Sequence, residues 1–245
     1  MTLNSTSGIL YIRASLSPFA DRIKCSGGVI AFLHQSFLFD EIIVPHFFSP
    51  RPFWRPTSHL PKVTNSGSLG KIVANDEQAF VDRHPTHSFA GVGQRVVSVL
   101  EMHDHNTSCF FPISELASRY DFSMLLLACV KESPGFSTVH AVQSELGLSR
   151  KHLIRHIVRW DIDSGDRPKS IKAKEAPGCS MSFDKFYPFY ENDGNLIRGE
   201  LFGKSYIFIK SAKKAMDVER QILRSNPRFV DCGNLMCPTC SFRLY

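Results

Sequence analysis

The sequence predicts a domain of the α/β or α+β class, and three observations lead to this expectation. Segments with strand and helix patterns alternate along the chain, which is typical of both classes. A continuous apolar run at 124–130 suits a strand buried in the centre of a sheet. Hydrophobic residues make up 43% of the 245 residues, enough to form a sizeable core. We therefore expect a single domain over 1–245, with space for a smaller subregion around 150–205.

In the first half of the chain, apolar spacing and flanking glycine and proline residues set the limits of the expected elements. They are a strand at 8–13, a helix at 29–37, a second apolar run at 41–44, a long irregular segment at 45–75 and a helix at 88–102. Ser88 is a suitable N-cap for the last helix, although Gly91 and Gly93 weaken its first turn.

In the second half, the apolar run at 124–130 is followed by elements with clear ends. Gly147 ends one predicted helix, and the Asn-Pro pair at 226–227 ends another. The expected elements are helices at 113–120, 137–146 and 211–223 and strands at 124–130, 152–160 and 205–209.

The charge balance gives little support to nucleic acid as a partner. Lys and Arg number 29 and Asp and Glu number 23, which gives a net charge of +6. The basic residues are spread along the chain without a run of five or more, and this balance suits an anionic ligand equally well.

No apolar stretch reaches about 18 residues, so we expect no transmembrane helix. The polar start at 1–7 predicts no secretory segment and therefore a cytoplasmic protein.

Seven cysteines, an odd number, favour a reducing compartment and unpaired thiols. Cys237 and Cys240 form a CxxC motif close to Cys232. A structural zinc site would need a fourth ligand, such as Cys179. Because no second CxxC accompanies the motif, the sequence favours plain thiols and no metal, with a zinc-stabilised binding module as the alternative.

Two segments carry most of the chemical information. The first, at 83–93, has the sequence Arg-His-Pro-Thr-His-Ser-Phe-Ala-Gly-Val-Gly, and the second, at 137–140, has the sequence Ser-Thr-Val-His. The second segment follows the predicted buried strand and begins a predicted helix. A histidine in that position lies where open α/β sheets bind their ligands.

With their flanking residues, these segments resemble the aminoglycoside 3-N-acetyltransferases, also called antibiotic N-acetyltransferases. The family motif His-Pro-x-x-Ser-Phe-Ala-Ala-x-Gly is matched from His84, with Gly91 at the second alanine. The family motif Thr-x-x-His-x-x-Glu is matched at 137–143, with Ser137 and Gln143 in place of its first and last residues. Weaker matches at 13–16, 43–45 and 103–116, and a loose match in the tail at 183–185, Gly194, Gly203 and Pro227, extend the resemblance over roughly 8–230.

The resemblance implies a mixed central sheet flanked by helices and a transferase that uses acetyl-coenzyme A as acyl donor. It places His140 as the general base and Gln143 as the residue that orients its ring. It also places Ser15, His84 and Ser88 in contact with the cofactor. The acceptor would be an amine of an aminoglycoside or another amino sugar, and antibiotic resistance would be one outcome.

Gln143 is the main departure from the family pattern. An amide can orient the imidazole but cannot stabilise the imidazolium with a full charge. Three hypotheses follow: the enzyme is slower, another carboxylate such as Glu145 or Asp121 substitutes, or only ligand binding remains.

Only the pattern of charged residues in the sequence indicates which class of acceptor the enzyme would use. Asp161, Asp163 and Asp166 form the clearest acidic cluster and would suit a polycationic aminoglycoside. The segment at 167–174 is basic and would suit a phosphorylated amino sugar of polysaccharide biosynthesis. In both cases the partner is a small-molecule amine rather than nucleic acid or membrane, and a homodimer stays open.

Overall fold

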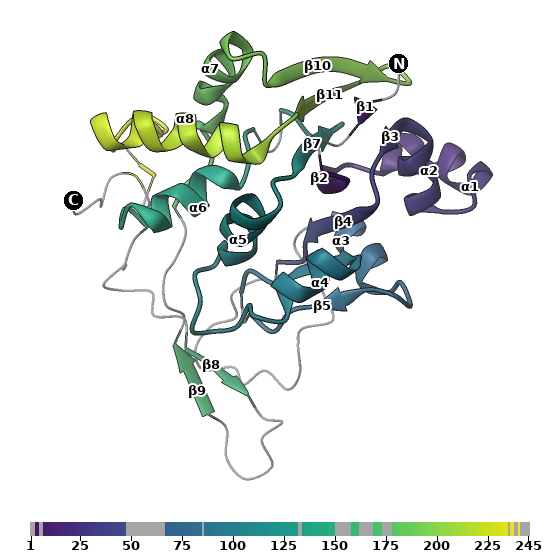
Figure 1. The fold of residues 1–245 in the computed structure, drawn as a ribbon, viewed down its shortest axis with the longest axis horizontal. Helices are drawn as coiled ribbons and strands as arrows, with labels where there is room; N and C mark the ends of the chain where they lie inside the picture. Colours follow the sequence, from purple (N-terminus) through teal and green to yellow (C-terminus); the bar gives the residue numbers. More distant parts are fainter. Residues whose placement is uncertain are drawn as a thin grey trace.

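The computed structural model describes residues 3–4, 7–47, 67–84, 86–131, 134–149, 158–161, 169–172, 178–234, 236–237 and 240. Within these residues, seven strands form one mixed sheet (Figure 1). The central strand is parallel to both of its neighbours, and the remaining pairs are antiparallel. In sheet order the strands are β10 (Leu196–Leu201), β11 (Lys204–Ile209), β7 (Ser123–Leu127), β2 (Ile9–Ala14), β4 (Glu41–Pro45), β6 (Phe89–Val92) and β5 (Phe80–Val81).

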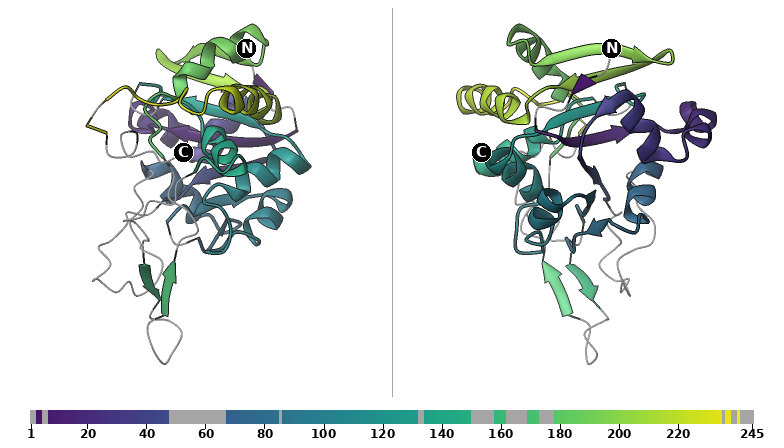
Figure 2. Two further views of the ribbon diagram at one scale, coloured as in Figure 1. Left: turned by 90° about the vertical axis from the view of Figure 1, so that its left-hand side faces the viewer. Right: turned by 45° about the vertical axis from the view of Figure 1, so that its right-hand side comes forward.

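Helices cover both faces of the sheet, so the expected mixed sheet with flanking helices is confirmed (Figure 2). Along β2, Ile9 and Tyr11 enter one core and Leu10 and Ile12 enter the other, because alternate residues of a strand face opposite sides. One face carries α4 (Gln94–Leu100), α5 (Phe111–Arg119), α6 (Thr138–Glu145) and α8 (Ala212–Ser225). The other carries α1 (Ala20–Cys25), α2 (Val29–Ser36) and α3 (Gly67–Ala74).

The helix predicted at 88–102 is wrong in its first half. Residues 89–92 form β6, and α4 begins only after Gly93, which turns the chain with a φ of 113°. A Cβ atom on Gly91 would lie 2.3 Å from Val96 Cγ1 and 2.9 Å from the Ile42 carbonyl oxygen. The glycine therefore allows the helix to pack closely on the strand that precedes it.

The long irregular segment predicted at 45–75 is wrong at its end, where α3 forms. Gly70 of this helix packs against the end of β4, since its Cβ would meet the Pro45 carbonyl oxygen at 2.5 Å. Residues 48–66 lie outside the described residues.

The strand predicted at 152–160 is confirmed where the structure describes it. β8 (Val158–Asp161) pairs with β9 (Lys169–Lys172) as an antiparallel hairpin that lies apart from the main sheet. Besides β6 and α3, the elements that the sequence did not predict are β1 (Leu3–Asn4), β3 (Phe37–Leu38), η1 (Ser17–Phe19), α1, η2 (Phe183–Phe186), α7 (Tyr187–Asn192), β5, β9 and β10.

The three parallel strands bring the functional segments to one edge of the sheet. Because β4, β2 and β7 run in the same direction, their carboxyl ends lie side by side. The backbone N–H of Ser15, just beyond β2, donates to the carbonyl oxygen of Leu127 at the end of β7 (3.0 Å). The chain then leaves β7 and begins α6 at residue 138. This edge therefore holds the ends of β2 and β7 together with the start of α6.

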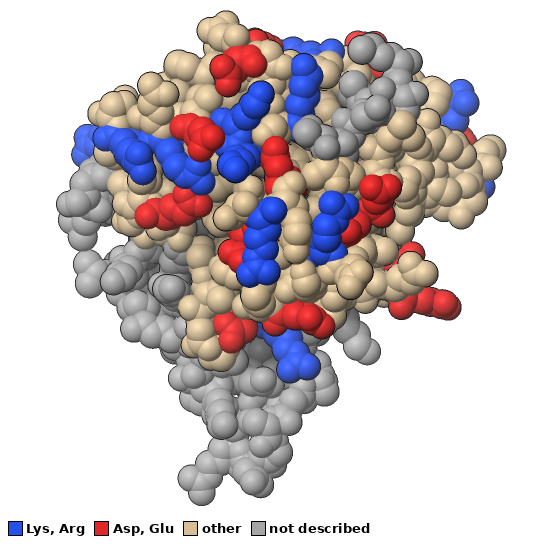
Figure 3. Space-filling view, viewed as in Figure 1, with Lys and Arg blue, Asp and Glu red and all other residues tan. Residues whose placement is uncertain are grey.

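Charged side chains are interspersed by sign over the face shown in Figure 3. Exposed ion pairs among the described residues include Arg220 with Glu145 and Arg198 with Glu191. No helix among the described residues is both long and apolar enough to cross a membrane.

Candidate active site

His140 lies in the first turns of α6, where its ring is held between two aromatic side chains. The Phe110 ring stacks on it with centroids 4.8 Å apart and planes 23° apart. The Phe183 ring meets it edge-on at 4.6 Å. Only 9% of His140 is exposed, so these contacts fix the orientation of the imidazole.

Gln143 lies one turn further along the same helix and is 2% exposed. Its Oε1 atom lies 3.1 Å from His140 Nδ1. With an amide oxygen as acceptor, Nδ1 carries the proton and Nε2 is the basic nitrogen of the ring. The spacing predicted that these two residues share one helix face, and the structure places them in hydrogen-bonding contact.

The start of α6 is tied to the sheet by hydroxyl groups. Ser137 Oγ lies 2.7 Å from the hydroxyl of Tyr11, a buried residue of β2. Thr138 Oγ1 donates to Glu219 Oε1 of α8 (2.6 Å), and the Tyr190 hydroxyl of α7 donates to the same oxygen. Burial raises the pKa of Glu219 to about 8. A single carboxyl group therefore joins three helices behind the His140 segment.

The two carboxylates that could replace the missing family glutamate are engaged elsewhere. Glu145 forms an ion pair with Arg220 (2.8 Å) on the protein surface. Asp121 accepts from Ser211 Oγ (2.6 Å) and from the backbone N–H of Lys213 (3.0 Å), so it supports the start of α8. The side chain that contacts the imidazole at Nδ1 is the neutral Gln143.

The segment at 82–93 folds around the buried carboxylate of Asp82. This group accepts from the backbone N–H groups of His84 (2.9 Å) and Phe89 (2.8 Å). It also pairs with His103 Nδ1 at 2.7 Å. Burial raises the pKa of Asp82, while the hydrogen bonds from His103 and the two N–H groups act in the opposite direction. These partners therefore offset part of the cost of burying the carboxyl group.

Ser88 is not a helix N-cap, because the strand β6 rather than a helix begins after it. Its hydroxyl donates to the Asp82 carbonyl oxygen (3.1 Å) and closes the turn. His84 accepts the backbone N–H of His87 at Nδ1 (3.0 Å) and stacks on His103 with ring centroids 4.6 Å apart. Ser88 and His84 are both fully buried. In these positions, both side chains stabilise the turn that precedes β6.

Phe110 connects the two sequence segments. Its ring contacts both His87 (5.4 Å between centroids) and His140 (4.8 Å). The sequence did not single out Phe110 or Asp82, and it indicated Phe183 only as part of the loose match in the tail. The nearest indication was their position beside matched residues, since Phe110 precedes the Phe-Pro pair at 111–112 and Asp82 precedes the motif at 84–93.

The other predicted contacts are only partly described. Ser15 is half-buried at the carboxyl edge of the sheet, as expected from its motif. Close to it, Arg13 Nη1 donates to the Gly135 carbonyl oxygen (3.2 Å). Asp161 is the last residue of β8, and Asp163 and Asp166 lie outside the described residues.

Comparison with solved structures identifies the fold. Aminoglycoside acetyltransferase AAC(3)-IVa superposes with a TM-score of 0.70 at 14% identity, covering 97% of this chain and 90% of that one. YokD from Bacillus subtilis gives 0.68 at 17%, covering 92% and 89%. AAC-IIIb in a binary complex with CoASH gives 0.66 at 13%, covering 90% and 91%. The chain therefore has the fold of these acetyltransferases, as the motifs implied. The sequence matches no protein-family model and no curated protein.

Proposed function

We propose that this protein is an acetyl-coenzyme A-dependent N-acetyltransferase that acts on an amine of an amino sugar, with His140 as its general base. The observation that carries the proposal is the His140–Gln143 contact on the first turns of α6, at the carboxyl edge of the sheet. The fold shared with AAC(3)-IVa and with CoASH-bound AAC-IIIb supports the reaction class.

In the proposed reaction, His140 moves one proton twice, first from the amine to its own ring and then from the ring to the sulfur of coenzyme A. An ammonium acceptor first loses a proton to solvent, and the neutral amine then attacks the thioester carbonyl carbon. His140 Nε2 takes the second amine proton as the C–N bond forms. The C–S bond then breaks, and the imidazolium returns that proton to the departing thiolate of coenzyme A. Gln143 holds the ring in the tautomer in which Nε2 is the base.

Coenzyme A presents amide carbonyl groups and phosphates to its binding site. At the carboxyl edge, the Ser15 hydroxyl and the Arg13 guanidinium are donors suited to such groups. His84 and Ser88, both fully buried, act by holding the turn at 82–89 rather than by touching the cofactor. This assignment keeps Ser15 as a cofactor contact and makes the other two positioning residues.

Two classes of acceptor fit the chain. AAC-VIa, which has the same fold, is bound to sisomicin, and an aminoglycoside of this kind would suit the acidic residues Asp161, Asp163 and Asp166. A phosphorylated amino sugar would suit the basic segment at 167–174. Comparing acetyl transfer to aminoglycosides with transfer to nucleotide-linked amino sugars separates the two.

A second candidate function, binding of coenzyme A without turnover, is favoured by the neutral Gln143. The test is release of free coenzyme A thiol from acetyl-coenzyme A, measured over a panel of amino sugars. We expect turnover by the natural chain, and loss of turnover without loss of coenzyme A binding in His140→Ala.

The exposed histidine variant His105→Ala is the matched control and should behave like the natural chain. Equal turnover by His140→Ala and by the natural chain would remove His140 as the base. Coenzyme A binding with no turnover on any amine would leave the second candidate.

A further inference from the structure

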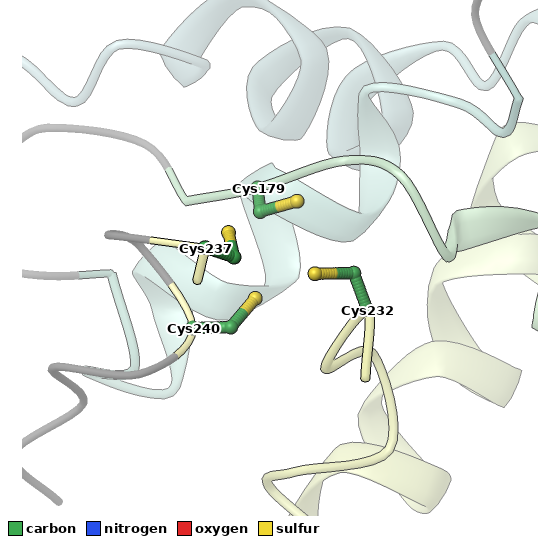
Figure 4. Close-up of side chains that lie close together, drawn as sticks. All are labelled: Cys179, Cys232, Cys237 and Cys240. Carbon is green, nitrogen blue, oxygen red and sulfur yellow. The ribbon is translucent and has the colours of Figure 1, made fainter. Parts of the chain in front are cut away.

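Four cysteines from two distant segments meet at one point outside the active site (Figure 4). Cys179 lies shortly before η2, and the other three follow α8 at positions 232, 237 and 240. Their four sulfur atoms all lie within 4.8 Å of one another. Each side chain is partly buried, so solvent has limited access to the cluster.

We infer that Cys179, Cys232, Cys237 and Cys240 bind one structural zinc ion. A tetrahedral site with Zn–S bonds of about 2.3 Å places its sulfur atoms about 3.8 Å apart, which is compatible with the observed limit of 4.8 Å. The CxxC pair at 237–240 has the ligand spacing typical of such sites. Four protein ligands also close the coordination sphere, which is typical of structural rather than catalytic zinc.

The choice of zinc follows from the donor set. All four donors are thiolate sulfurs, which select zinc or iron and exclude the hard ions magnesium and calcium. A cluster of several iron atoms would separate some of its cysteine ligands further than a single ion does, because the four cysteines would be shared between two irons or spread over four. A single tetrahedral ion suits the compact arrangement.

The zinc site would link two segments of the chain that already contact each other. Lys185 Nζ donates to the carbonyl oxygens of Phe229 (3.1 Å) and Asp231 (2.7 Å). The rings of Phe186 and Phe229 lie 5.0 Å apart. These contacts bring η2 against the chain that follows α8, and a metal bound by the four cysteines would fix that arrangement.

The same segment supports His140. Phe183, the first residue of η2, lies four positions after Cys179 and contacts the imidazole edge-on. A Cβ on Gly135 would lie 2.1 Å from Phe183 Cβ, so the loop before α6 is also packed on this residue. Zinc would thus stabilise one wall of the candidate active site without touching the reacting groups.

The first experiment is elemental analysis of the full chain, expressed with zinc in the medium and purified without chelators. We expect about one zinc per chain. In the double variant Cys232→Ser/Cys240→Ser the zinc content should fall to near zero. Two control variants should keep the zinc. Cys25→Ser alters an exposed cysteine elsewhere in the chain, and Cys109→Ala alters the separate cluster that Cys109 forms with His84 and His87.

Cobalt substitution of the natural chain gives a readout that does not depend on the variants being folded. A site of four thiolates shows intense thiolate-to-cobalt charge-transfer absorption together with the d–d bands of tetrahedral cobalt. Their appearance at about one cobalt per chain supports the site.

Four results would overturn the inference: absence of zinc from the natural chain, zinc retained by the double variant, iron in place of zinc, or a non-reduced mass lower by two hydrogens per disulfide formed among the four cysteines. Each of these readings is independent of acetyl transfer, so failure of the proposed function would leave the zinc test unaffected.

Discussion

The Oε1 atom of Gln143 lies 3.1 Å from Nδ1 of His140, and both residues are almost completely enclosed by protein. The base of the proposed reaction therefore has a neutral partner where the resembling family has a carboxylate. An amide oxygen orients the ring as a carboxylate would, but it adds little to the stability of the imidazolium that forms when the amine loses its proton. This relationship separates orientation from charge stabilisation and makes the two effects measurable.

Restoring a negative charge at position 143 is the most direct test of the charge-stabilisation effect. In Gln143→Glu, we expect the acetyl-transfer rate to rise by about tenfold or more, because a carboxylate at 3.1 Å stabilises the imidazolium. The pKa of His140 should rise as well, so the acidic limb of the pH–rate profile should move to higher pH. Steady-state kinetics across pH measure both effects. Gln143→Ala, which loses orientation as well, should be slower than the natural chain. A slower, folded Gln143→Glu would contradict the expected role.

The aromatic contacts of the His140 imidazole give a second prediction. Phe110 is 3% exposed and packs against His140, His87 and Phe89. We expect Phe110→Ala to lower the free energy of unfolding by about 3–5 kcal/mol, the usual cost of deleting a buried ring. Chemical denaturation measures this change.

Phe110→Leu separates packing from ring orientation. It should recover most of the stability but leave kcat reduced, because a leucine fills volume without stacking on the imidazole. Phe189→Ala, in a side chain that is 41% exposed, is the control and should change stability little. Full activity in Phe110→Leu would show that the stacked ring does not orient His140.

The elements that the sequence predicted best are those with a single unambiguous pattern. The apolar run that became β7 and the helix at 138–145 that ends before Gly147 were both confirmed. The segment 88–102 misled because its apolar residues keep helical spacing through β6 and α4. Gly91 and Gly93 carried the correct information, but the need for them arises from contacts with Val96 and Glu41 that only the fold creates.

The candidate site divides in the same way. The contact between His140 and Gln143 depends on local helix geometry, so spacing alone could predict it. The aromatic residues on either side of the ring come from 30 residues before and 43 residues after His140, as the numbering of Phe110 and Phe183 shows. The meeting of Cys179 with the cysteines beyond α8 is equally non-local. Such contacts are decided by tertiary packing and leave no periodic pattern.

A third prediction concerns the buried pair of Asp82 and His103. Asp82→Asn keeps the shape but places an amide N–H₂ opposite donors that now reach the carboxylate, among them the Phe89 N–H. We expect the free energy of unfolding to fall by about 1–3 kcal/mol, the usual cost of leaving a buried polar group without its partner. Thermal and chemical unfolding measure the loss, and Asp104→Asn in the adjacent loop is the control.

The double variant Asp82→Asn/His103→Gln tests whether the loss comes from the contact between the two side chains. Removing the imidazole together with its partner should restore part of the stability, because Nδ1 of the imidazole then no longer faces a changed partner. If the two single losses simply add, the pair is not coupled and the prediction is wrong.

The last prediction is the pH dependence contributed by Glu219. Its pKa is raised from 4.5 to about 8 because the carboxyl group is completely buried. The folded state therefore holds a proton that the unfolded chain has already released above a pH of about 4.5. Stability from this group is greatest below that pH and falls as the pH rises, until the folded group also ionises near 8.

In Glu219→Gln this loss should disappear, since an amide oxygen still accepts from Thr138 and Tyr190 but carries no titrating proton. The variant should therefore gain stability relative to the natural chain as the pH rises, with the gain levelling off near 8. Chemical denaturation of both chains across this range measures the difference, and Glu191→Gln, which alters an exposed glutamate paired with Arg198, is the control. Parallel stability curves for the natural chain and Glu219→Gln would mean that Glu219 is already ionised in the folded protein, and the three-helix junction would then have to stabilise a buried charge through its two hydroxyl donors.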